Sequence, residues 1–216
     1  MPDLNFRVEM AEPLDRAVTP QLVFRLRIEN RTAGESIHSM ILRCQVQIEA
    51  PRRRYDAEEK ELLRDLFGEP ERWGQTLRPM LWANTTVTVT AFVDATLVDL
   101  PVPCTFDFNV AATKYFHALK DGEVPVSLLF SGTVFYEPGS GALQVAQIPW
   151  DRQATYRLPV SVWKRMMDIY YPDAAWLCLR RDLFDQLYRY KVSHGIATWE
   201  QTIEKLLPQA ERKAAS

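Results

Sequence analysis

The sequence predicts an α+β protein whose main part is an antiparallel β-sandwich of about seven strands with immunoglobulin-like architecture. Two observations lead to this prediction. Apolar and polar residues alternate in segment after segment between Phe6 and Gln147, and a period of two is typical of strands with one buried face. After Pro159 the apolar residues recur at helical spacing, which predicts a C-terminal helical layer.

The first three strands are predicted at residues 6–9, 22–29 and 40–49. The second and third alternate strictly, and a turn is expected between them at 30–35, where Thr32 and Gly34 interrupt the pattern. The residues expected inside the core are Leu22, Phe24, Leu26 and Ile28 from the second strand, and Met40, Leu42, Cys44, Val46 and Ile48 from the third.

An inserted helix is predicted at residues 56–67. Asp56 and Glu59 have the three-residue spacing of a capping box, in which each side chain accepts a hydrogen bond from a backbone amide of the other end of the first turn. Gly68 is expected to end the helix. Residues 74–79 are then expected to return the chain to the sheet.

Four further strands are predicted at 85–93, 104–110, 124–136 and 142–148, with a short helical turn at 113–119. The segment 124–136 is apolar on both faces, which predicts a central strand or one covered by helices. A hairpin loop at 137–141 joins it to the last strand.

Three helices are predicted after the strands. Ser161 is expected to cap the first, Asp182 to start the second, and Thr198 with Gln201 to cap the third. Segment 175–179 is an edge strand or an extended connector. Residues 1–158 are thus expected to form the sandwich, 159–208 helices packed on it, and 209–216 a polar tail. The tryptophans expected to pack these helices on the sheet are Trp150, Trp163, Trp176 and Trp199.

The composition is that of a soluble domain without a nucleic-acid partner. The 216 residues carry 26 Lys and Arg against 28 Asp and Glu, so the basic excess of a duplex-binding domain is missing. No apolar run approaches the ~20 residues that span a bilayer. The three cysteines are odd in number and surrounded by apolar residues, which is typical of free thiols. With no secretory signal at the N-terminus, we expect the cytoplasm.

No motif predicts an enzyme, a cofactor or a metal site. The three histidines stand at no ligand spacing from one another or from a cysteine, and there is no C-x-x-C pair. Ser140 lies in a Pro-Gly-Ser-Gly hairpin rather than in a strand-to-helix nucleophile turn. We therefore predict no catalytic, cofactor-binding or metal-binding residue.

The one candidate site is the basic run Arg52, Arg53 and Arg54 with Tyr55. One interpretation is a solvated corner whose arginines pair with Glu58, Glu59 and Glu61. The other is a dock for an anion or an acidic partner, because guanidinium groups bind carboxylates and phosphates in a bidentate manner. Arg25, Arg27 and Arg43 extend this dock if their strands belong to the same sheet.

Several blocks of sequence together carry a resemblance to a known family. They are Leu26–Ile28, Leu42–Val46, Pro51–Asp56, Leu66–Trp73, Thr76–Trp82, Leu100–Phe108, Lys114–Leu119, Leu129–Phe135 and Trp150–Val160 with Trp163. Along nearly its whole length the chain resembles a bacterial family of unknown function that is associated with gene clusters encoding nickel–iron hydrogenases. The resemblance implies a role in assembly or maturation beside a hydrogenase, and it assigns no functional residue.

These observations favour a non-enzymatic accessory or protein-interaction module, which supports assembly or maturation of a hydrogenase complex. A protein partner is expected, and a homo-oligomer is compatible with the sequence. The alternatives are a domain that binds a small ligand or anion, with Arg52–Arg54 at its mouth, and a chaperone-like protein for immature chains.

Overall fold

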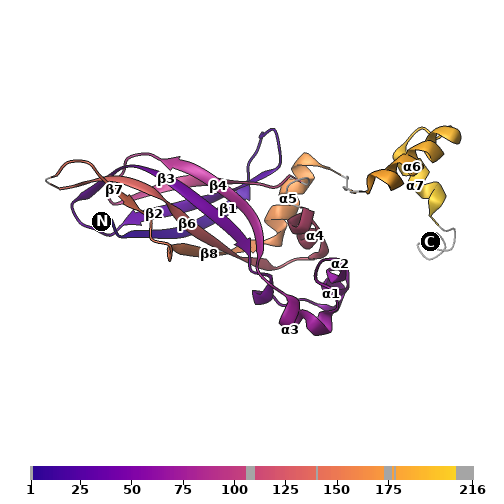
Figure 1. The fold of residues 1–216 in the computed structure, drawn as a ribbon, viewed down its shortest axis with the longest axis horizontal. Helices are drawn as coiled ribbons and strands as arrows, with labels where there is room; N and C mark the ends of the chain where they lie inside the picture. The colour runs from indigo at the N-terminus through magenta and orange to yellow at the C-terminus, as the bar shows by residue number, and fades with distance from the viewer. Residues whose placement is uncertain (1, 106–109, 140, 173–176, 178, 208–216) are drawn as a thin grey trace. The chain divides into compact units, whose positions relative to one another are not determined.

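The structure is a computed structural model that describes residues 2–105, 110–139, 141–172, 177 and 179–207 (Figure 1). These residues form eight strands, seven α-helices and two short 3-10 helices. The strands make two antiparallel sheets, so the α+β class is confirmed. The chain divides into two compact units, residues 1–174 and 175–216. No helix in the described ranges is long and apolar enough to cross a membrane.

The smaller sheet has the order β1-β2-β5, with β1 at Leu4–Pro13, β2 at Gln21–Asn30 and β5 at Ala95–Pro103. Strand β5 was not predicted, because Pro101 and Pro103 are uncommon in strands and tolerated mainly at sheet edges, where β5 lies. The prediction of a strand at 104–110 is wrong at both of its boundaries. The strand stops at Pro103 and a helix starts at Val110, while 106–109 lie outside the described residues.

The larger sheet has five strands. β4 (Met80–Val89), β3 (Glu35–Ile48) and β6 (Glu123–Pro138) lie side by side, and β6 pairs on its other edge with both β7 (Gln144–Gln147) and β8 (Gln153–Pro159). The central position predicted for 124–136 is confirmed. The prediction of about seven strands missed β8, whose few core residues make a weak pattern. Strand β4 also begins and ends earlier than the predicted 85–93.

The two sheets contribute to one hydrophobic core. Phe6 of β1 stacks on Phe130 of β6 with 4.3 Å between ring centroids, and Phe24 of β2 packs edge-on against Trp82 and Tyr156. Every core residue predicted from the second and third strands is buried. Where the register of β3 slips against β6, at His38, the bulge keeps both Ile37 and Met40 inside.

The predicted inserted helix is two short helices. α1 (Ala57–Leu62) and α2 (Arg64–Phe67) meet at Leu63, and η1 (Ala50–Arg52) precedes them. The Asp56–Glu59 capping box is confirmed, and Gly68 ends α2 with a φ of 76°. Residues 74–79 do not return directly to the sheet, because η2 (Pro70–Arg72) and α3 (Trp73–Thr76) come first.

Helices α1 to α5 gather at one end of the sheets (Figure 1). α4 (Val110–Ala118) and α5 (Val160–Tyr170) pack together there through Phe116 and Trp163, whose rings stack at 5.1 Å. The predicted cap at Ser161 is wrong, because α5 starts at Val160 without a side-chain cap. Trp163 is buried as expected, but the Trp150 residue is 91% exposed and packs no helix on the sheet.

The second unit contains α6 (Arg181–Ser193) and α7 (Trp199–Leu206). α6 starts one residue before Asp182, and Gly195 follows it with a φ of 62°. Thr198 caps α7 by accepting a hydrogen bond from the Gln201 amide at 3.2 Å, as predicted. Most of segment 175–179 and all of 209–216 lie outside the described residues. The boundary at residue 158 and the packing of 159–208 on the sandwich stay predictions.

Candidate functional site

The candidate site lies where β3 leaves the larger sheet. The Glu49 amide donates to the Pro125 carbonyl of β6 at 2.9 Å, and Pro51 then turns the chain into η1. The Glu49 carboxylate is 12% exposed and accepts a hydrogen bond from Ser127 Oγ at 2.7 Å. Arg52 Nε stands 3.6 Å from the same carboxylate, and its side chain is 67% exposed. Arg52 is thus positioned by the sheet and open to solvent.

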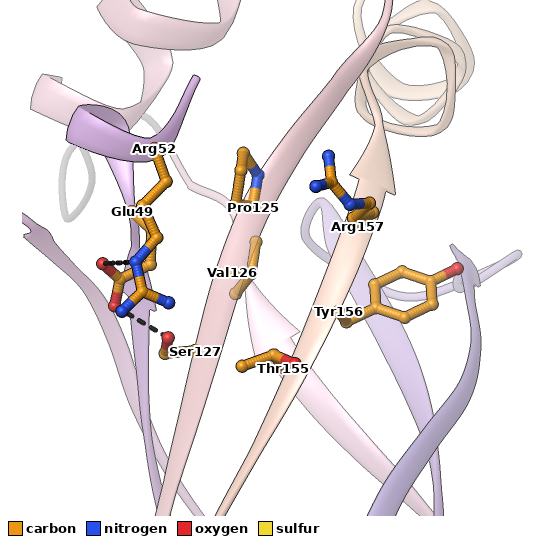
Figure 2. A pocket seen from close by; sticks show the side chains of 8 residues that line it. All are labelled: Glu49, Arg52, Pro125, Val126, Ser127, Thr155, Tyr156 and Arg157. Atoms are coloured by element: carbon orange, nitrogen blue, oxygen red, sulfur yellow. Dashed lines mark hydrogen bonds and ion pairs between the residues drawn. The ribbon is translucent and has the colours of Figure 1, made fainter.

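A first hollow, of about 190 Å³, lies between Arg52 and β8 (Figure 2). The strand register sets its lining, because Ser127 pairs with Thr155 and Pro125 pairs with Arg157. Figure 2 shows the side chains of Arg52 and Arg157 on either side of Pro125. Arg157 is 73% exposed and stands 3.8 Å from the exposed Glu123 carboxylate, a weak solvent-exposed pair. Two guanidinium groups therefore flank one hollow.

A second hollow, of about 590 Å³, shares Glu49 and Arg52 with the first. The rings of Tyr55 and Trp73 line it, and they pack edge-to-face with centroids 5.4 Å apart. The exposed Arg78 also lines it. We call the set Glu49, Arg52, Arg78 and Arg157 the arginine corner. It offers three exposed guanidinium groups beside an aromatic wall, which is suited to carboxylate or phosphate recognition.

Arg53 lies inward, next to the arginine corner. Its side chain is 9% exposed and forms a bidentate pair with the 5% exposed Glu59, with N–O distances of 2.7 and 2.8 Å. The remaining guanidinium N–H groups donate to the carbonyls of Asp121 at 2.8 Å, Glu123 at 3.3 Å and Arg54 at 3.3 Å. Arg53 thereby ties the start of α1 to the start of β6.

Glu59 is held ionised by its partners. Burial opposes the charged carboxylate, but the hydrogen bonds from Arg53 and from the Lys120 amide outweigh burial and lower the pKa of Glu59. The same side chain completes the capping box by accepting from the Asp56 amide at 3.3 Å. Its charge and lone pairs therefore serve the fold.

The hydroxyl of Tyr55 belongs to this inner group, while its ring lines the second hollow. Its hydroxyl lies 2.8 Å from both the Ala50 carbonyl and the Tyr115 hydroxyl, and the Arg53 guanidinium sits 5.1 Å from its ring centroid. Burial raises the pKa of both tyrosines. We call Arg53, Tyr55, Glu59 and Tyr115 the buried arginine cluster.

The predicted site residues thus lie in different environments. Arg52 belongs to the arginine corner, Arg53 and Tyr55 belong to the buried arginine cluster, and the Arg54 side chain is exposed. The sequence did not indicate Arg78, which lies between α3 and β4, or Arg157, which lies on β8 far along the chain. The capping box places Glu59 in the first turn of α1, close to Arg53, and this was the sequence signal that could have predicted their ion pair.

The other basic residues considered with the run do not extend it. Arg25 and Arg27 lie on β2 in the smaller sheet, where they pair with Asp99 at 3.0 Å and Glu29 at 2.8 Å. Arg43 lies on β3 in the larger sheet, but it lines a separate hollow with Trp150. Arg25 and Arg27 therefore do not extend the dock, because β2 belongs to a different sheet from β3.

The buried Cys44 and Cys104 and the ring of His117 serve packing. Burial raises the pKa of Cys44 and of Cys104 to about 12, which leaves both free thiols protonated. His117 packs edge-on against Trp163, and burial followed by the nearby Lys164 lowers its pKa. Within the described ranges, no three His, Cys, Asp or Glu side chains gather closely enough to hold a metal ion. Ser140 lies outside the described residues.

Comparison with known proteins places the chain in a family. A model of DUF6084, a family of unknown function, matches residues 1–215. The chain therefore belongs to DUF6084. Neither the comparison with curated proteins nor the comparison with solved structures found a match.

Proposed function

We propose that this DUF6084 protein is a non-enzymatic accessory module that binds an acidic segment of a partner protein at the arginine corner. One observation carries the proposal: Arg52, Arg78 and Arg157 have exposed guanidinium groups around two adjoining hollows. The neighbouring Arg53, in contrast, forms an ion pair with the buried Glu59. Exposed clustered charges of this kind raise association rates and select partners by charge.

The proposed scaffold is a two-sheet sandwich with immunoglobulin-like architecture. The stacking of Phe6 on Phe130 across the sheets supports it, and so does the proximity of β1 to β8 and of β4 to β5 at the two edges. Such a scaffold has a rigid end at which loops and short helices can present side chains. The arginine corner lies at that end.

The first partners to test are nickel–iron hydrogenase subunits and their maturation factors, because the sequence resemblance points to that gene neighbourhood. The proposed setting is the cytoplasm, which fits the free thiols of Cys44 and Cys104. An accessory role needs no catalytic group, and the proposal names none.

The test is partner binding by the full chain and by two triple variants. Arg52→Gln/Arg78→Gln/Arg157→Gln removes the charge of the corner. The matched control Arg7→Gln/Arg31→Gln/Arg165→Gln removes the same charge from exposed residues elsewhere. Candidate subunits, and an oligoglutamate peptide as a defined acidic probe, are titrated at low and high salt.

We expect the corner variant to weaken binding about tenfold or more and the control about twofold or less. The difference between the variants should shrink at high salt, since screening shortens the range of exposed charges to a few ångström near 1 M. Equal losses in the two variants, or binding that ignores salt, would refute the arginine corner as the dock.

A small anion is the second candidate ligand, and the smaller hollow favours it. Arg52 and Arg157 flank a hollow of about 190 Å³ that Thr155 also lines, which is the size and chemistry of a site for a phosphate or small carboxylate. Thermal melting with inorganic phosphate and with small dicarboxylates separates the two candidates. A shift abolished by Arg157→Gln alone supports the small ligand, because binding raises stability by mass action.

A further inference from the structure

The second unit carries apolar side chains that its own helices leave exposed. α6 has no buried residue, and the buried residue of α7 is Thr202. Side chains of 43–61% exposure occur along both helices. The face that we call the hairpin face consists of Phe184, Tyr188, Val192, Trp199, Ile203 and Leu206.

The hairpin face is continuous across the two helices. Phe184, Tyr188 and Val192 recur every four residues along α6. Along α7, Ile203 follows Trp199 by four residues and Leu206 follows Ile203 by three, which keeps them on one face. Ring contacts join the helices, because Trp199 lies 5.3 Å from Phe184 and 6.3 Å from Tyr188 between centroids. The opposite sides carry polar residues.

We propose that the hairpin face binds the same face of a second copy of the chain. Two such hairpins related by a twofold axis make a four-helix bundle, in which each apolar stripe covers the other. Two short helices cannot bury a core by themselves, since helical stability in proteins comes mainly from packing an amphipathic face. The inference is independent of the arginine corner and uses none of its residues.

The exposed area is sufficient for such a pair. A large side chain offers roughly 150–250 Å² when fully exposed, so the five that are about half exposed, together with the partly buried Trp199, offer on the order of 500 Å² per copy. A symmetric pair then hides about 1,000 Å², the size at which specific interfaces begin. The exposed apolar residues of the first unit are instead dispersed over separate elements, such as Ile41 on β3, Leu62 on α1 and Leu97 on β5.

The test is the mass of the full chain in solution as a function of concentration, measured by sedimentation equilibrium. The chain has a mass of 25.0 kDa, and we expect a concentration-dependent dimer. Val192→Glu/Ile203→Glu places charges in the hairpin face and should weaken dimerisation by about 100-fold or more. The matched control Gln186→Glu/Gln201→Glu adds the same charge on the polar side and should leave the dimer intact.

A second measurement covers the case in which the charged variant loses its helices. Hydrogen exchange of the wild-type chain should show protection in α6 and α7 that increases with protein concentration. If the wild-type chain is a monomer at all concentrations, the proposal is overturned. If α6 and α7 of that monomer are nevertheless protected from hydrogen exchange, the chain's own first unit covers the hairpin face. A dimer that survives Val192→Glu/Ile203→Glu with its helices folded also overturns it, because another surface then forms the contact.

Discussion

Arg52 and Arg53 are neighbours in sequence, yet they belong to two regions with opposite uses of the same guanidinium group. In the buried arginine cluster, Arg53 has a bidentate carboxylate partner and further carbonyl acceptors. In the arginine corner, Arg52 approaches Glu49 at 3.6 Å and remains 67% exposed. Arg52 is the last residue of η1, whereas Arg53 follows it with an extended backbone and reaches Glu59.

The comparison shows that burial determines whether an arginine stabilises the fold or remains available for binding. A buried ion pair contributes little relative to an apolar pair, but breaking it leaves an uncompensated charge and is strongly destabilising. An exposed pair contributes about 0–1 kcal/mol and stays available to another molecule. The buried arginine cluster should therefore govern stability, and the arginine corner should govern binding.

The largest expected effect is that of Arg53→Met. The substitution leaves the Glu59 carboxylate buried without its partner, so we expect the free energy of unfolding to fall by about 3–5 kcal/mol in urea titrations. The control is Arg53→Met/Glu59→Leu, which removes both charges and should recover a large part of the loss. A loss below about 1 kcal/mol for the single variant would contradict a structural role for Arg53.

The next effect depends on pH. The pKa of Glu59 is lowered in the folded state, so its contribution is fully present above the unfolded value of about 4.3 and is lost as pH falls through the folded value. Glu59→Gln should cost about 1.5–3 kcal/mol at neutral pH, and this cost should diminish as the solution is acidified below about pH 4. Urea titrations across pH check this, with the exposed Glu61→Gln as the control. A cost that is the same at all pH values would mean that Glu59 acts by shape rather than charge.

A smaller effect is expected for Tyr115→Phe. It removes the hydroxyl that lies against Tyr55, while Tyr55 keeps its hydrogen bond to the Ala50 carbonyl. We therefore expect a loss of about 1 kcal/mol in the free energy of unfolding. Tyr190→Phe, at a partly exposed position of α6 outside the hairpin face, is the matched control and should be neutral. Equal losses of unfolding free energy in the two variants would show that the Tyr115 hydroxyl does not stabilise the buried arginine cluster.

The smallest effect on stability is expected for Arg52→Gln/Arg157→Gln. Both side chains are largely exposed, so thermal melting should change by an amount equivalent to about 0.5 kcal/mol or less. The same variant should bind acidic probes less tightly than the wild type. A large loss of stability would assign the corner to folding and would erase the distinction between the two regions.

The sequence pattern predicted the parts of the fold in which local signals agree with packing. β2 and β3 alternate strictly, Asp56 and Glu59 form their capping box, and Thr198 caps α7. The strands that were missed lack such signals, because β5 contains two prolines and β8 contributes few core residues. The bulge at His38 could not be predicted, since it depends on the register against β6.

The candidate site was predictable only in part. A run of three arginines is visible in the sequence, but of the three only Arg52 lines both hollows. Arg157 joins the arginine corner through the register of β8 against β6, and Arg78 joins it where the chain passes from α3 into β4. A single sequence carries no signal for either placement. The division between Arg52 and Arg53 follows from the position of Glu59, six residues further on, after α1 has folded.

The prolines that hide β5 from the sequence pattern also affect how folded copies meet. β5 is an edge of the three-stranded sheet, and a strand edge with unpaired N–H groups can recruit a strand from another molecule. Pro101 and Pro103 have no N–H to offer, so an incoming strand cannot complete a ladder along this stretch. This end of the edge is therefore protected against the strand-by-strand growth that leads to aggregation.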